Sequence, residues 1–210
     1  MRKAGLLFCI LFISLISTAC INNLAIQELN EIGKKYLEQG EVDEAIARFQ
    51  SSVDLDENLY ESRYNLGVAY IKKEDYINAI KTLEKASEIN PELPDIHYSL
   101  AVALEGEALK LDNFSEEILN DNEEKQEEDN TEFTPELARD YLDYAAKSIQ
   151  EYKLYLKLSK NSSNDKEQIE ERINKIKKVM AQSCEKYGIN PTVFPIDLTG
   201  VLENDNTSAQ

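Results

Sequence analysis

An internal repeat with a 34-residue period constrains the fold of this chain more than any other feature. The first copy begins at Ile26 and reads IQELNEIGKKYLEQGEVDEAIARFQSSVDLDENL, and the second begins at Tyr60 and reads YESRYNLGVAYIKKEDYINAIKTLEKASEINPEL. The matched positions are Ile32-Gly33 with Leu66-Gly67, Tyr36 with Tyr70, Ala45 with Ala79, Phe49 with Leu83, and Ser52 with Ala86. Apolar residues at helical spacing predict two helices per copy, and the copies must stack because one hairpin cannot bury its own apolar face.

Two glycines, Gly33 and Gly67, lie inside helical patterns. A glycine there costs about 1 kcal/mol relative to alanine, so we predict that a second helix approaches each of them closely. The 34-residue spacing and these positions resemble the tetratricopeptide repeat (TPR), which has two antiparallel helices per unit. The resemblance implies an all-α fold, an α-solenoid of TPR helical hairpins with about three repeats and a C-terminal capping helix.

The rest of the chain divides around this array. In the third copy His97, Leu100, Ala101 and Leu104 occupy packing positions, and its second helix returns only after an interruption, with Ser148 and Tyr152 at the small and large positions. We therefore predict a structural role for His97. The predicted segments are 26–59 (first repeat), 60–93 (second repeat), 94–160 (third repeat, split by a loop over 112–133), 164–187 (capping helix) and 188–210 (tail).

The interruption is strongly acidic and lacks apolar periodicity, which predicts a disordered loop. A calcium site is the alternative, but an EF-hand loop starting at Asp121 would need glycine where Gln126 stands. The tail holds apolar residues, among them Phe194 and Ile196, which either dock back on the repeats or await a partner.

The N-terminus predicts export and anchoring. Arg2 and Lys3 precede a short apolar run, and Thr18-Ala19-Cys20 follows it. We interpret residues 1–19 as a signal peptide. The junction resembles a bacterial lipobox, although Ser17 departs from its usual aliphatic residue, and this implies that Cys20 is lipidated. Residues 20–25 would form a short tether. Cys9 would leave with the signal peptide, so only Cys184 would then remain as a thiol, partly buried and inert.

The composition and motifs argue against catalysis and against nucleic acid. The formal net charge is -17 and no basic stripe interrupts it, whereas phosphate binding needs clustered Lys and Arg. The chain has one histidine and carries no nucleophile, metalloprotease, Walker or dinucleotide motif. We expect no catalytic residue, no metal, no cofactor and no small-molecule substrate.

Binding of a protein is the favoured function. In the TPR family the first helix of each repeat lines a concave groove, which here implies a groove lined by Asn30, Lys34, Leu37, Tyr64, Asn65, Val68, Ile71, Lys72, Tyr98 and Val102. The family's clamp for acidic C-terminal peptides is not matched, because Asn30 and Lys34 are exchanged and the third copy offers Asp95 and Ser99.

These features together predict a lipid-anchored TPR scaffold or assembly factor at the bacterial cell envelope. By resemblance to Gram-negative lipoproteins, the absence of Asp after Cys20 implies the outer membrane if the cell is Gram-negative. The partner would be an envelope protein that offers a peptide or a helix. The alternatives are a carboxylate-based enzyme or accessory subunit of an envelope complex, and a structural lipoprotein whose groove is filled by its own tail.

Overall fold

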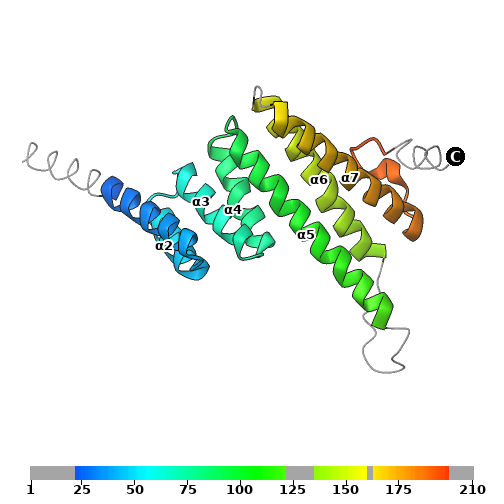
Figure 1. Cartoon of the computed structure of the whole chain (residues 1–210), viewed down its shortest axis with the longest axis horizontal. Coiled ribbons are helices and arrows are strands. Elements are labelled where there is room, and N and C mark those ends of the chain that lie inside the picture. Colours follow the sequence, from blue (N-terminus) through cyan, green and yellow to red (C-terminus); the bar gives the residue numbers. More distant parts are fainter. Residues whose placement is uncertain (1–21, 122–134, 160–162, 199–210) are drawn as a thin grey trace, which may run out of the picture. The chain divides into compact units, whose positions relative to one another are not determined.

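The computed structural model describes residues 22–121, 135–159 and 163–198, and every regular element in these ranges is helical (Figure 1). The all-α prediction is confirmed. The predicted signal peptide and Cys20 lie outside the described residues. The elements are a first helix over residues 22–39, α2 (Val42–Leu55), α3 (Tyr60–Lys72), α4 (Tyr76–Ile89), α5 (Pro94–Asp121), α6 (Pro135–Leu158), α7 (Ser163–Tyr187) and the short 3-10 helix η1 (Pro191–Val193).

The chain forms two compact units, Met1–Pro91 and Glu92–Gln210, called here the N-terminal and the C-terminal unit. The N-terminal unit consists of two helical hairpins, the first helix with α2 and α3 with α4, and α2 packs on α3. The predicted close approach at the glycines is confirmed. A Cβ atom added to Gly33 would lie 2.5 Å from Phe49 Cε1, and one added to Gly67 would lie 2.5 Å from Leu83 Cγ.

The turns of the two hairpins repeat the same backbone geometry 34 residues apart. Gly40 and Glu74 both have positive φ angles, 82° and 61°. The N–H of Glu41 donates to the carbonyl of Tyr36 at 2.9 Å, and the N–H of Asp75 donates to the carbonyl of Tyr70 at 3.0 Å. A glutamate in the left-handed region costs roughly 1–2 kcal/mol. Packing of the two helices therefore dictates this turn even where no glycine is present.

The C-terminal unit is a layer of three helices in which α6 packs against both α5 and α7 (Figure 1). Its core contains the residues that the sequence pattern assigned to packing. Ser148 and Tyr152 are fully buried, and His97 is 4% exposed. The apolar face of α7 joins the same core through Ile169, Ile173, Ile176 and Met180.

The tail docks on this core as far as residue 198. Gly188 ends α7 with a φ of 65°, and the N–H of Ile189 then donates to the carbonyl of Cys184 at 2.9 Å. Phe194, Ile196 and Leu198 are each 5–7% exposed within the core of the C-terminal unit. Of the two possibilities for the tail, docking therefore holds for this stretch, and residues 199–210 lie outside the described part.

The predicted start of the acidic loop at residue 112 is wrong, because α5 continues to Asp121. The stretch from 112 to 121 contains no Gly or Pro, and Phe114 and Ile118 stand at helical spacing. Extending an existing helix adds one hydrogen bond per residue fixed, so negative charge alone does not end it. The remainder of the predicted loop lies outside the described residues.

The predicted tether over residues 20–25 is also too long, because residues 22–25 already belong to the first helix. This stretch, Asn-Asn-Leu-Ala, holds no helix breaker, and Ile26 next to it is 5% exposed. The buried anchor at Ile26 lets the helix extend one turn further toward the N-terminus.

Candidate partner-binding surface

The residues predicted to line a groove fall in both compact units. The first helix carries Asn30, Lys34 and Leu37, α3 carries Tyr64, Asn65, Val68, Ile71 and Lys72, and α5 carries Tyr98 and Val102. The first two sets lie in the N-terminal unit and the third in the C-terminal unit.

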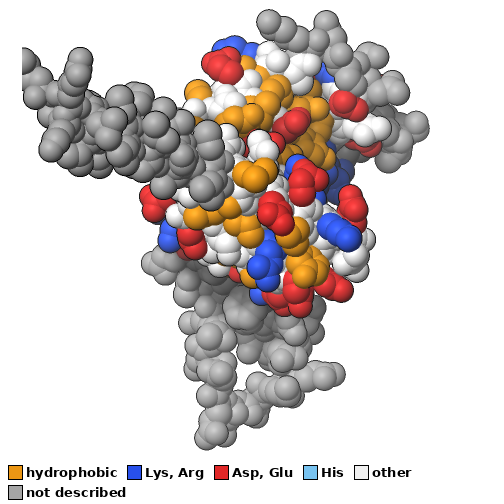
Figure 2. Space-filling model, turned by 90° about the vertical axis from the view of Figure 1, so that its left-hand side faces the viewer, with side chains coloured by type: hydrophobic (Ala, Val, Ile, Leu, Met, Phe, Trp, Pro, Cys, Tyr) orange, Lys and Arg blue, Asp and Glu red, His pale blue; other side chains and the backbone are white. Residues whose placement is uncertain are grey.

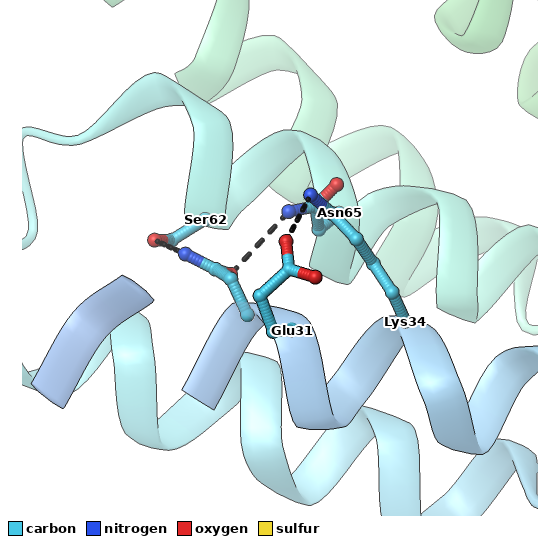
Figure 3. Close-up of polar contacts among 5 residues, drawn as sticks. Glu31, Lys34, Ser62 and Asn65 are labelled. Atoms are coloured by element: carbon cyan, nitrogen blue, oxygen red, sulfur yellow. Dashed lines mark hydrogen bonds and ion pairs between the residues drawn. The ribbon is translucent and has the colours of Figure 1, made fainter. Parts of the chain in front are cut away.

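A buried polar network joins the two hairpins of the N-terminal unit beneath this surface (Figure 3). Asn30 Nδ2 donates to Ser62 Oγ at 3.1 Å, and Asn65 Nδ2 donates to Asn30 Oδ1 at 3.3 Å. Ser62 Oγ also lies 2.8 Å from Ser52 Oγ of α2. Asn30 is only 7% exposed. Its amide therefore holds the first helix against α3, and it lies below the surface rather than on it.

The two predicted lysines of the N-terminal unit lie exposed at the surface and contact neighbouring groups. Lys34 Nζ forms an ion pair with Glu31 at 3.2 Å, one turn earlier on the first helix (Figure 3). Lys72 Nζ donates to the carbonyl of Leu37 at 3.1 Å. That carbonyl lies in the last turn of the first helix, where a cation interacts favourably with the helix dipole.

An apolar strip lies between these polar contacts on α3. Tyr64, Val68 and Ile71 stand at helical spacing and are all half-buried. On the face of the molecule drawn in Figure 2, hydrophobic side chains lie at the surface between acidic and basic ones. The strip is the part of the predicted surface that can take up an apolar side chain of another protein.

In the C-terminal unit Tyr98 belongs to an aromatic cluster. Its ring centroid lies 6.0 Å from that of Tyr152 and 5.3 Å from that of Tyr155, both on α6. Tyr98 still exposes 36% of its surface, whereas Val102 is partly buried against the core. Tyr98 thus packs on α6 and also offers one part of its ring to the outside.

A carboxylate ties the cluster to α7. Glu105 Oε2 accepts from Tyr152 Oη at 2.7 Å and from Arg172 Nε at 2.6 Å. Arg172 also places its Cζ atom 5.6 Å from the centroid of the Tyr152 ring. Burial, followed by the negative charge of Glu105, raises the pKa of Tyr152 well above its ordinary value of 10. Tyr152 therefore stays protonated as a donor.

A second carboxylate holds the predicted structural histidine, since His97 Nδ1 lies 2.7 Å from Glu151 Oε2. Burial raises the pKa of the Cys184 thiol, which is 4% exposed, in keeping with an inert cysteine. Among the described residues no group of three or more His, Cys, Asp or Glu side chains could hold a metal ion.

Among the surface pockets of the C-terminal unit, two lie between its long helices. The first, of about 80 Å³, is apolar and is lined by Ala108, Leu109, Tyr141, Ala145, Ile176 and Val179, with Glu105 and Lys175. The second, of about 180 Å³, is polar and is lined by Asp95, Tyr98, Tyr155, Asp165, Gln168 and Ile169. Sequence reasoning missed the second, because nothing in the sequence indicates that Asp165 at the start of α7 lies beside Asp95 and Tyr98 of α5.

Comparison with known proteins supports the repeat assignment. A family model described as TPR repeat matches residues 33–74 and 69–107. Residues 33–107 are therefore similar to TPR repeats, and the described helices form an array of TPR-type hairpins. A stretch of 60 residues is 35% identical to the cell division cycle protein 27 homolog of Caenorhabditis elegans. That stretch covers 29% of this chain and 8% of the relative.

Solved TPR structures share the fold at low sequence identity. The first TPR of Spaghetti (RPAP3) bound to an HSP90 peptide superposes with a TM-score of 0.52 at 18% identity, covering 74% of this chain and 93% of that chain. The second TPR domain of human RPAP3, in complex with an HSP70 peptide, gives 0.51 at 15% identity, covering 74% and 98%.

No helix within residues 22–121, 135–159 and 163–198 is both long enough and apolar enough to span a bilayer.

Proposed function

We propose that this protein is a lipid-anchored TPR scaffold or assembly factor of the bacterial cell envelope, which binds a peptide or a helix of an envelope partner. The observation that carries the proposal is the combination of TPR repeats over residues 33–107 with a lipobox-like cysteine at position 20. The repeats supply a binding surface, and the lipid would fix it at a membrane.

The apolar strip of α3 supports partner binding. Tyr64, Val68 and Ile71 are half-buried and do not belong to the core cluster of Phe49, Leu66 and Ala69 beside them. An apolar strip with polar groups at its edge suits an extended peptide or an amphipathic helix. Two structures of similar fold were solved with peptides bound. Because the clamp residues for acidic tails are not matched here, the partner segment would be of a different kind.

Anchoring is tested by membrane fractionation of the full chain and two variants. We expect Cys20→Ala to move the protein from the membrane to the soluble fraction, because one or more acyl chains are lost with the sulfur. Cys9→Ala, a matched change in the same leader, should leave the protein in the membrane. Membrane association of Cys20→Ala equal to that of the unchanged protein would contradict lipidation.

Partner binding is tested by crosslinking and pull-down of the full chain from native membranes, followed by identification of the captured proteins. Tyr64→Ser should reduce capture of a specific partner at least tenfold while the helical circular dichroism signal is retained. The matched control is Ile77→Ser on α4, which removes a 49% exposed apolar side chain elsewhere on the same hairpin. Equal capture by both variants would refute the strip of α3 as the binding surface.

A further inference from the structure

The polar pocket of the C-terminal unit is formed by three helices together. Asp95 and Tyr98 come from α5, Tyr155 from α6, and Asp165 and Gln168 from α7, with Ile169 beside them. Its volume of about 180 Å³ is more than ten times the roughly 10–15 Å³ that a single water needs. Asp95, Asp165 and Gln168 are exposed, so the pocket opens to solvent and can admit the end of a side chain.

The lining of this pocket is complementary to a positive charge. It presents two carboxylates and two phenol rings, and none of the residues that line it is Lys, Arg or His. A cation within about 6 Å of an aromatic ring face is attracted by the ring, and carboxylates form charge-assisted hydrogen bonds with ammonium and guanidinium groups. Asp95 and Asp165 each lie in the first turn of their helix, where the helix dipole favours the ionised carboxylate.

The electrostatics of Tyr155 agree with this lining. Its pKa is raised first by burial, and then by the negative charges of Asp165 and Asp95 and by Tyr98. These carboxylates therefore act on the ring from both flanking helices, α7 and α5. The formal charge of the whole chain, -17, adds a long-range attraction for basic ligands.

The same aromatic cluster already holds a guanidinium within the chain. Arg172 lies over the ring of Tyr152 and donates to Glu105, and Tyr98 packs on Tyr152 edge to face. The C-terminal unit therefore already binds one of its own arginines with a tyrosine ring and a carboxylate. Tyr98, Tyr155 and the two aspartates provide the same combination around a pocket that can admit a side chain of another molecule.

We propose that the pocket of Asp95, Tyr98, Tyr155 and Asp165 receives a lysine or arginine side chain of the partner protein. This inference rests on the proposed function and states its chemistry more closely, since the partner then offers a basic residue to the C-terminal unit. A bound divalent ion is the competing occupant, and it is one outcome of the experiment below.

The experiment is an NMR titration of the full chain with labelled tyrosines. The probes are N-acetyl-arginine amide, its neutral isostere N-acetyl-citrulline amide, and calcium chloride alone. We expect the arginine derivative to shift the ring signals of Tyr98 and Tyr155 with saturation, and the citrulline derivative and calcium to leave them unchanged. Equal shifts with citrulline, saturation by calcium alone, or no shift at about 20 mM, some twenty times a Kd of 1 mM, would overturn the proposal.

A double variant and a matched control distinguish the effect of the pocket on binding from that of the overall charge. Asp95→Asn with Asp165→Asn should weaken binding of the arginine derivative at least tenfold. Asp140→Asn with Asp143→Asn makes the same charge change on exposed residues of α6, about 18 Å or more along the helix from Tyr155, and should have little effect. Equal weakening by both pairs would reduce the effect to the net charge and overturn the pocket.

Tyr155→Leu gives a second reading that does not depend on the aspartates. It keeps an apolar side chain at the position but removes the ring, so binding should weaken while Tyr98 still reports it. Because the probes need no partner, failure here leaves the pull-down result standing. If the pull-down captures no partner but the arginine derivative still binds, the proposed function is contradicted and the cation-binding pocket is not.

Discussion

Replacing Gly67 with alanine tests the packing that defines the second hairpin. The added Cβ would lie 2.5 Å from Leu83 Cγ and 2.7 Å from Leu83 Cδ2, whereas carbon atoms pack best at about 3.5–4.0 Å. One of the helices must therefore move by roughly 1 Å. Overpacking of this size costs about 1–3 kcal/mol, and the better helix propensity of alanine returns about 1 kcal/mol. We expect a net loss of up to about 2 kcal/mol in the free energy of unfolding.

A double-mutant cycle with Leu83→Ala isolates the interaction between positions 67 and 83. This change alone should cost about 2–5 kcal/mol, because Leu83 is fully buried and leaves a cavity. It also removes Cγ, Cδ1 and Cδ2, the three atoms nearest to the new Cβ. In the Leu83→Ala background, Gly67→Ala should therefore stabilise the protein by about 1 kcal/mol, because only the propensity gain remains. The sign of the effect reverses between the two backgrounds.

The assay is urea unfolding followed by circular dichroism, with hydrogen exchange of α3 and α4 to identify the transition that belongs to the N-terminal unit. The four free energies should give a coupling of about 1–3 kcal/mol between the two sites. Stabilisation by Gly67→Ala in the unchanged background, or the same effect in both backgrounds, would refute the claim that the glycine is required by the approach of Leu83.

Two further predictions concern the C-terminal unit. Because the folded chain holds the proton of Tyr152 above the ordinary pKa of 10 while the unfolded chain loses it, stability is fully present below pH 10 and falls as the pH rises beyond it. For Tyr152→Phe the free energy of unfolding should fall less steeply between pH 9 and 11, by up to about 1.4 kcal/mol per pH unit. An equal fall for both proteins, measured by urea unfolding at pH 9 and 11, would contradict this. Phe194→Ala should cost about 3–5 kcal/mol of unfolding free energy, whereas Val193→Ala, 53% exposed next to it, should stay within about 0.5 kcal/mol; a small loss for Phe194→Ala would mean that the tail contributes no packing.

The hairpins could be predicted from the sequence because their packing is periodic. Gly33 and Phe49 recur as Gly67 and Leu83 after 34 residues, and both pairs meet in the structure. Tyr152 was likewise assigned to packing from its position in the pattern, and it is fully buried. Positions of this kind are determined by contacts within one repeat or with its neighbour, so a single sequence with two copies is sufficient to find them.

Element ends were harder to predict, and the acidic segment shows why. The high negative charge from Asp112 onward predicts a loop, yet α5 runs to Asp121. Mutual repulsion of carboxylates costs only fractions of a kcal/mol per pair on a helix, whereas Gly or Pro costs one to several. Where neither breaker occurs, composition does not indicate the residue at which a helix ends.

The candidate site was predictable only in part, for a different reason. Asn30 was assigned to a groove because its position lies on the first helix of a repeat, but its amide is engaged by Ser62 and Asn65 and is buried. A polar residue on the correct helix face can serve either packing or binding, and only the partners across the interface decide between them. Such partners stand 32 and 35 residues away and carry no pattern of their own.

The residues of the polar pocket could likewise not be recognised as a binding site from the sequence. Asp95 and Asp165 look in the sequence like ordinary acidic residues of two helix starts, a placement that the helix dipole alone explains. They become a site only because α6 brings Tyr155 between α5 and α7, beside Tyr98. In a repeat array, short-range periodic contacts determine how the helices pack, whereas a binding site forms where residues of different helices meet. For this chain the residues that meet in this way are a pair of carboxylates and two aromatic rings, and the proposal of a basic side chain in the pocket rests on them.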